Sequence, residues 1–174
     1  MLRQRKDSHS CRETEMLEIR IICVGKLKEQ YWEAAIAEYT KRLGAYCRIS
    51  VTEVREEKLP ANASPADERA VTEAEGRSVL SKTAKGDFVI ALDVRGRELS
   101  SEELAEKIRE TAFTHPVIDF IIGGSLGLSD EVKRRADLRM SFGRITLPHQ
   151  LARVVLAEQI YRAFKINAGE TYHK

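Results

Sequence analysis

Short apolar runs alternate with amphipathic stretches along the chain, and the spacing of the apolar positions separates strands from helices. Continuous or alternating apolar positions predict strands at residues 19–24, 48–54, 88–94, 117–122 and 139–142. Apolar positions three and four residues apart predict helices at residues 29–43, 65–85, 100–115, 129–135 and 148–166. This alternation is typical of an α/β fold with a mostly parallel sheet flanked by helices.

Residues 1–15 differ from the rest of the chain because they contain almost no apolar side chains and show no periodicity. We therefore expect a disordered N-terminal extension at 1–15 and one folded domain at 16–174, with Met16 as a candidate natural start. The hydrophobic content of 43% and charged content of 32% are typical of a soluble globular protein. No apolar run approaches the ~18 residues of a membrane span, and no signal peptide is visible, so we expect a cytoplasmic protein without membrane contact.

Common signatures of metal and covalent chemistry are absent from the sequence. Cys11, Cys23 and Cys47 are odd in number and widely spaced, which argues against a disulfide framework and against a zinc site. The four histidines include no pair at metal-ligand spacing, and the nucleophile elbow, the P-loop and the dinucleotide-binding glycine motif do not occur. We therefore expect a site without a metal ion.

Positive charge is concentrated in the last part of the chain. Residues 133–174 contain nine Lys or Arg and three acidic residues, a balance of +6, whereas the whole chain carries only +2. Such a basic segment favours a polyanionic partner such as nucleic acid, and solvated helix faces are the alternative explanation.

Two glycine-containing turns follow predicted strands in the same part of the chain. The apolar strand 117–122 runs into Gly123 and Gly124, and Gly143 follows the strand 139–142, shortly before Pro148 opens a helix. Glycine lets the backbone turn sharply and approach a ligand, and in open α/β sheets ligands bind at the carboxyl ends of the strands. Either turn alone reads as an ordinary βα connection. The two together, followed by a polar tail, indicate a binding site.

Five motifs carry a resemblance to a known family. They are 23–28 (CVGKLK), 92–96 (LDVRG), 122–127 (IGGSLG), 146–150 (TLPHQ) and 172–174 (YHK). In this order they resemble the RlmH-type large-subunit ribosomal RNA methyltransferases, which methylate N3 of a pseudouridine. The resemblance runs from about Met16 to Lys174, and residues 1–15 have no counterpart in it.

The resemblance implies a SPOUT fold, in which the C-terminal segment of an α/β sheet forms a trefoil knot, a feature that general fold rules disfavour. It also implies a homodimer, and S-adenosyl-L-methionine as the methyl donor. The apolar positions on more than one side of the predicted helix 148–166 favour a dimer as well. By the family's pattern the donor binds among three loops, whose residues here are Leu92, Gly123, Gly124, Phe142, Gly143, Arg144, Ile145, Thr146 and Leu147.

The same resemblance places the terminal Tyr-His-Lys near the methyl donor. His173 and Tyr172 are candidates for removing the N3 proton, and Arg153 and Lys174 for binding phosphate or stabilising negative charge on the base. Because position 174 is lysine, a bidentate arginine contact is absent there. The candidate RNA contacts are Arg144, Lys165 and Lys174.

We therefore expect an S-adenosyl-L-methionine-dependent methyltransferase that modifies N3 of a pseudouridine in 23S ribosomal RNA, on the assembled ribosome. Two alternatives stay open. One is a SPOUT methyltransferase for another RNA such as tRNA, and the other is a non-catalytic α/β protein that docks on the ribosome through its basic segment.

Overall fold

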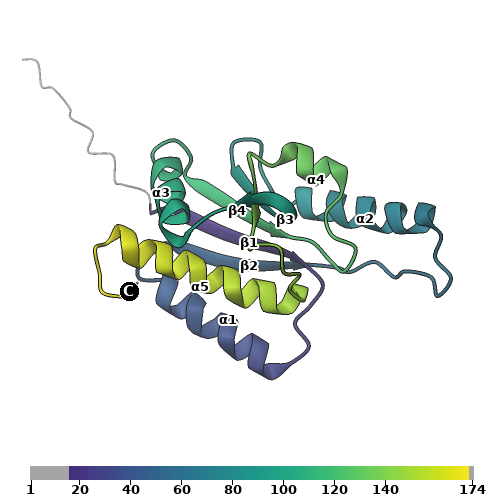
Figure 1. Ribbon diagram of the computed structural model, residues 1–174, viewed down its shortest axis with the longest axis horizontal. Coiled ribbons are helices and arrows are strands. Elements are labelled where there is room, and N and C mark those ends of the chain that lie inside the picture. Colours follow the sequence, from purple (N-terminus) through teal and green to yellow (C-terminus); the bar gives the residue numbers. More distant parts are fainter. Residues whose placement is uncertain (1–15, 173–174) are drawn as a thin grey trace, which may run out of the picture.

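The computed structural model describes residues 16–172, which form a five-stranded parallel sheet with helices on both faces (Figure 1). The strands are β1 (Glu18–Val24), β2 (Arg48–Val54), β3 (Phe88–Glu98), β4 (Val117–Ile122) and β5 (Leu138–Ser141). Their order in the sheet is β2-β1-β4-β3-β5, and every neighbouring pair is parallel. The α/β class with a mostly parallel sheet is confirmed. The expected extension at 1–15 lies outside the described residues, as do His173 and Lys174.

The helices are α1 (Gln30–Leu43), α2 (Pro65–Leu80), α3 (Ser101–Ala112), α4 (Asp130–Arg135) and α5 (His149–Asn167). They build two apolar clusters, one between the sheet and α1, α3 and α5, the other between the sheet and α2 and α4. Alternate residues of β1 face opposite clusters: Ile19 and Ile21 belong to the first, and Ile22 and Val24 to the second. Because both faces are covered, the central strands read as continuous apolar runs.

Two helices, α2 and α3, begin directly after a serine that caps them. The Oγ of Ser64 accepts the N–H of Asp67 at 3.2 Å, and the Asp67 carboxylate accepts the N–H of Ser64 at 2.8 Å. Ser100 and Glu103 repeat this reciprocal pair at 3.2 and 2.8 Å. Each capping box satisfies N–H groups that a helix start otherwise leaves free. α2 begins at the predicted residue 65, and α3 begins at 101, one residue after its predicted start.

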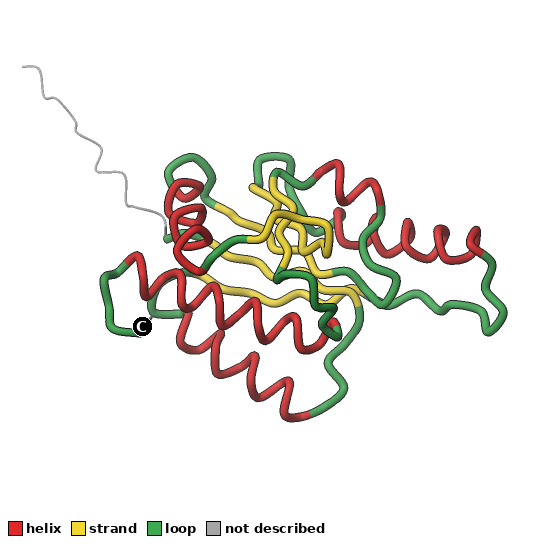
Figure 2. The backbone as a smooth tube through the Cα atoms, in the orientation of Figure 1, coloured by secondary structure: helices red, strands yellow, loops and turns green. Residues whose placement is uncertain are grey.

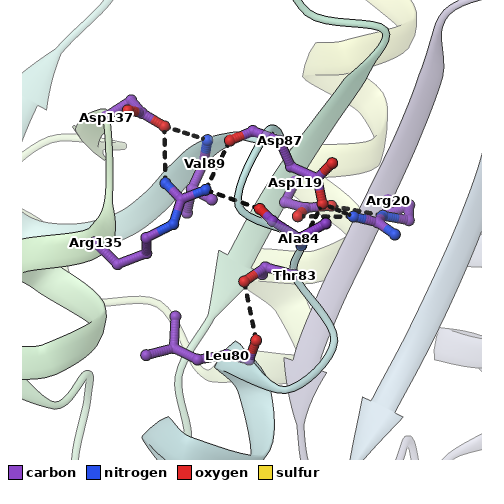
Figure 3. Close-up of polar contacts among 9 residues, drawn as sticks. All are labelled: Arg20, Leu80, Thr83, Ala84, Asp87, Val89, Asp119, Arg135 and Asp137. Atoms are coloured by element: carbon purple, nitrogen blue, oxygen red, sulfur yellow. Dashed lines mark hydrogen bonds and ion pairs between the residues drawn. The ribbon is translucent and has the colours of Figure 1, made fainter.

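α2 ends at Leu80, earlier than the predicted end at 85, because a tight turn follows it. The Asp87 carboxylate accepts the N–H of Ala84 at 2.6 Å. From α4, Arg135 donates to the carbonyl oxygens of Ala84 at 3.1 Å and Asp87 at 2.8 Å (Figure 3). These contacts join residues 51 and 48 positions apart in the chain. A local periodicity in the sequence therefore cannot predict them.

Arg20 ties the amino-terminal parts of three strands together (Figure 3). The glycine turns follow the carboxyl ends of β4 and β5, at the opposite end of the sheet. Its guanidinium donates to both carboxylate oxygens of Asp119, at 2.7 and 3.0 Å, and also binds Asp87, which immediately precedes β3. Asp119 is fully buried, and this burial raises the pKa of its carboxyl to about 6, although Arg20 acts in the opposite direction. The cluster fixes the frame of the sheet on the side away from the candidate site.

β3 continues to Glu98, beyond the end predicted at Val94. Leu92 and Arg97 both pair with Met140 of β5, so the four residues between them leave the ladder and return to it. At Gly96 a Cβ would lie only 2.7 Å from the backbone of Arg139 and Met140. The return is therefore compatible with glycine at position 96 and with no larger residue.

α5 lies between α1 and α3 and packs on the sheet (Figure 1). From position 149 to 166 each of its residues is at least partly buried, and Val154, Tyr161 and Phe164 pack against the first apolar cluster. Part of the apolar surface that favours a dimer is thus used within one chain. The homodimer stays a prediction.

Candidate functional site

A cavity of about 690 Å³ opens at the carboxyl ends of β3, β4 and β5, beside the first turn of α5. Its walls come from Leu92 to Val94 in the middle of β3, from the turn after β4, and from the segment that joins β5 to α5. Figure 2 shows that the loop leading into α5 and the long loop after β2 leave the same end of the sheet. The volume is typical of small-molecule sites, and the position agrees with the rule for open α/β sheets.

The cavity brings together eight of the nine residues expected to hold the donor. These are Leu92, Gly123, Gly124, Phe142, Gly143, Ile145, Thr146 and Leu147. The ninth, Arg144, is exposed and is not part of the lining, so its side chain is accessible to a large partner instead.

Gly123 and Gly124 serve the protein's own packing. A Cβ at Gly123 would lie 2.5 Å from the carbonyl oxygen of Gly127, across a turn closed by the Gly127 N–H and the Gly124 carbonyl at 3.0 Å. A Cβ at Gly124 would lie 2.9 Å from Oε2 of Glu75 and 3.1 Å from Val24. These glycines make room for protein atoms behind the cavity, and their close approach to a ligand stays a prediction.

Gly127 and Gly143 are the glycines of the lining that face open space. Their φ angles are +82° and +107°, which favour glycine, and an added Cβ would meet no atom of residues 16–172 within 4 Å. The Ser141 hydroxyl shapes the second turn: it accepts the N–H of Gly143 at 3.1 Å and lies 3.0 Å from its carbonyl oxygen. The open backbone at these two positions can approach a bound molecule closely.

His149 begins α5 and lines the cavity in a half-buried position. Burial lowers the pKa of its imidazole, and the positive charge of Arg153 lowers it further. The ring is therefore neutral near pH 7 and presents one hydrogen-bond donor and one acceptor.

Arg153 is buried, whereas a direct role in catalysis would require its side chain to reach the cavity. Its side chain is 0% exposed and donates to Glu53 at 2.9 Å and to the carbonyl oxygens of Val24 and Gly25 at 2.7 and 2.8 Å. The guanidinium thus clamps the carboxyl end of β1 to α5 and contacts no solvent. A direct part of Arg153 in catalysis stays a prediction, and its contacts are those of a structural residue.

Tyr172 packs along the second half of α5. Its ring centroid lies 5.0 Å from that of Tyr161 and 4.8 Å from the guanidinium of Arg162, and its hydroxyl lies 3.3 Å from Glu158. Burial, followed by the charge of Glu158, raises the pKa of the Tyr172 hydroxyl. A helix rises ~1.5 Å per residue, so Tyr161 lies ~18 Å along α5 from the cavity-lining His149. The structure therefore holds Tyr172 away from its own chain's cavity.

The remaining expected RNA contacts differ in accessibility. The Lys165 ammonium binds the Glu170 carboxylate and its side chain is only 14% exposed, whereas Arg144 is exposed at the rim of the cavity. The Tyr46 hydroxyl also donates to Glu170, at 2.9 Å, so Lys165 and Tyr46 bind the same carboxylate. Of these two cations, Arg144 is the more available to an anionic partner.

A family model described as "Predicted SPOUT methyltransferase" matches residues 17–173. The chain belongs to the SPOUT methyltransferase family. A protein of Carboxydothermus hydrogenoformans called "Ribosomal RNA large subunit methyltransferase H" is 55% identical, over 91% of this chain and 100% of that protein. A protein of Lactiplantibacillus plantarum with the same name is 53% identical over the same shares. The structure of a probable methylase family protein from Haemophilus influenzae matches with a TM-score of 0.51 and 15% identity, over 90% of this chain and 70% of that one.

Membership of the SPOUT methyltransferases confirms the resemblance carried by the five motifs. The structure adds lining residues that were not named as donor contacts: Asp93, Val94, Ile122, Ser125, Leu126, Gly127, Met140, Ser141, Pro148, His149 and Ala152. Most of them lie inside or next to the motifs 92–96, 122–127 and 146–150, so the signal was present. Met140, Ser141 and Ala152 lie outside these motifs, and only the fold brings them to the cavity.

Neither metal ligation nor membrane insertion has a structural counterpart in residues 16–172. No group of three or more His, Cys, Asp or Glu in this range is placed to hold a metal ion. Among the same residues, no helix has the length and apolar character needed to cross a membrane. Cys23 and Cys47 are free and buried, and burial raises the pKa of each thiol to about 12.

Proposed function

We propose that this SPOUT methyltransferase uses S-adenosyl-L-methionine to methylate N3 of a pseudouridine in large-subunit ribosomal RNA. The observation that carries the proposal is the cavity, which assembles eight of the nine residues that the family's motifs associate with the donor. Relatives more than 50% identical over nearly the whole chain are called large-subunit ribosomal RNA methyltransferases, which supports the RNA class. The place of action would be the assembled ribosome in the cytoplasm.

The cavity fits the proposed donor in size and chemistry. Leu92, Ile145 and Leu147 provide apolar walls for an adenine ring, while the open backbone at Gly127 and Gly143 offers polar groups to its edge. When bound, the donor supplies an electrophilic methyl group on a sulfonium. The protein's tasks are then to align the target nitrogen with that methyl group and to accept its proton.

The trefoil knot of SPOUT proteins is the fold that we propose for this site. Its support is that three segments distant in the sequence line one cavity: the part of β3 that leaves the ladder with β5, the turn after β4, and the segment from β5 into α5. A knot would hold these three segments rigidly around one ligand.

We further propose a homodimer in which each chain's tail completes the partner's cavity. The support is that Tyr172 packs against Tyr161 and Arg162, ~18 Å along α5 from the cavity of its own chain. In the proposed dimer His173 or Tyr172 takes the N3 proton, and Lys174 and Arg144 contact the RNA.

Nucleoside mass spectrometry after incubation with the donor tests the function. We expect N3-methylpseudouridine in 23S RNA when ribosomes are supplied. The matched variants are Gly143→Val, at φ +107°, which should abolish transfer, and Gly86→Ala, whose Cβ meets no described atom within 4 Å and which should retain it. Methylation of tRNA alone would support the second SPOUT reading, and ribosome binding without methyl transfer would support a docking protein.

Mixed dimers test whether the tail acts on the partner's cavity. Neither Gly143→Val nor His173→Ala should be active alone. After random reassociation half of the dimers are mixed and one of their two sites is intact, so about a quarter of the parent activity should return. A mixture as inactive as its components would place the tail on its own chain's cavity.

A further inference from the structure

Glu75 is a buried carboxylate directly behind the wall of the cavity. It lies on α2 and is 4% exposed, and its Oε1 accepts the N–H of Glu57 at 3.0 Å. Its Oε2 would lie 2.9 Å from a Cβ on Gly124, a residue that lines the cavity. Only the backbone of the glycine turn therefore separates this carboxylate from the space where a ligand binds.

The position of Glu75 is fixed by the packing of α2 against the start of α4. At the next residue, Gly76, a Cβ would lie 2.8 Å from the Cβ of Ser129, which leaves no room for a side chain. Ser129 caps α4 by accepting the N–H of Val132 at 3.2 Å. Close contact between the two helices thus holds the carboxylate against the turn.

The charge of Glu75 is not neutralised by a neighbouring cation. Within residues 16–172 it forms no ion pair, and the charged groups that face it are Glu56 and Glu57, both negative. The elements packed against it otherwise present Val24, Gly124 and Ser129. Burial, and then these two acids, raise the pKa of the Glu75 carboxyl, while the N–H of Glu57 lowers it. Arg153 is paired with Glu53 and does not pair with Glu75, although Arg153 and Glu56 both approach Gly25.

We propose that Glu75 is a specificity residue that makes the cavity prefer the methyl donor to the demethylated product. The inference rests on the proposed function. S-adenosyl-L-methionine and S-adenosyl-L-homocysteine differ by one methyl group and by the positive charge of the sulfonium. Above its raised pKa, the unpaired Glu75 carboxylate behind the cavity wall stabilises the charged molecule and leaves the neutral sulfur unaffected. Because the wall is a single turn thick and buried, salt screens this attraction only weakly.

Calorimetric titration with each of the two molecules at pH 8 tests this role. Glu75→Gln keeps the shape and an oxygen for the N–H of Glu57, but removes the charge. It should weaken donor binding about fivefold and leave product binding within about twofold. Glu75→Asp, which retains the charge, should keep most of the preference. The matched control is Glu73→Gln, an exposed acid on the same helix, which should bind both molecules like the parent.

The ratio of the two affinities separates charge from structure. If Glu75→Gln weakens donor and product equally, the residue only supports the turn and the proposal is wrong. Glu56→Gln, at an exposed position that the fold tolerates, should lower the ratio in the same direction by a smaller amount. If neither Glu75→Gln nor Glu56→Gln changes the ratio of donor to product affinity, the proposal is also wrong. A parent protein that binds neither molecule would instead refute the proposed function itself.

Discussion

Replacement of Arg153 by methionine tests whether this residue stabilises the end of β1 or takes part directly in catalysis. The guanidinium is 0% exposed and donates to Glu53 and to the carbonyl oxygens of Val24 and Gly25, at 2.7 to 2.9 Å. Methionine keeps the length and the apolar stem of the side chain. It removes all three hydrogen bonds at once.

The expected loss of stability follows from the groups that are left behind. A buried carbonyl without its donor costs about 1–3 kcal/mol, and two are affected here. Glu53 is 33% exposed and returns to water at little cost. The Nε of Arg153 has no hydrogen-bond partner within residues 16–172, so its removal relieves a cost that the parent carries. We expect a net loss of about 3 kcal/mol, at the lower end of the range for breaking a buried pair.

Thermal and urea unfolding measure this loss directly. For a domain of this size 3 kcal/mol lowers Tm by about 6–12 °C. Arg144→Met, at an exposed arginine, is the control and should unfold like the parent. If Arg153→Met unfolds at the parental midpoint yet transfers no methyl group, the clamp is wrong and Arg153 belongs to the reaction.

Three other perturbations probe the turn, the tail and the frame of the sheet. Gly124→Ala should lower both stability and donor affinity, because its methyl group would lie 2.9 Å from Glu75 and 3.1 Å from Val24; calorimetry showing normal donor binding would contradict this packing. His173→Ala should lower turnover at saturating RNA by ~10²–10⁴-fold with donor affinity unchanged, and turnover at the parent rate would exclude it as the base. Burial raises the pKa of Asp119 to about 6 in the folded protein, so protonation of this carboxyl contributes to the free energy of unfolding. The contribution should be complete below the ordinary pKa of 3.8 and should be lost as pH rises through about 6. Urea unfolding of the parent and of Asp119→Asn between pH 4 and 7 should give different pH slopes, and identical slopes would refute this assignment.

Local patterns predicted the elements whose boundaries are set by local chemistry. β2 and β4 have the predicted bounds, and α2 and α3 begin at the serine caps Ser64 and Ser100. The glycine turns also indicated the correct edge of the sheet, since parallel strands end on the same side. The donor loops followed from the family's motifs, and the cavity brings most of them together.

What the sequence left open depends on contacts between distant positions. The clamp of Arg153 joins residues 129 positions apart in the chain, and the end of α2 depends on Arg135, 51 positions from Ala84. In the sequence Glu75 does not differ from the other acidic residues of an amphipathic helix, and only the fold places it behind Gly124. No periodicity or motif records such neighbours, so these roles required the structure.

The path of β3 has a consequence for how variation in this protein is read. Beyond Leu92 the chain returns to β5 only because position 96 lacks a side chain, since a methyl group would lie 2.7 Å from the backbone of Arg139 and Met140. Val94, in the segment between, forms part of the cavity wall. Any substitution at Gly96 would clash with the backbone of β5 and displace this segment, and with it part of the cavity wall. The shape of this wall thus depends on a residue outside the cavity lining, and a survey of natural variants limited to the lining would overlook it.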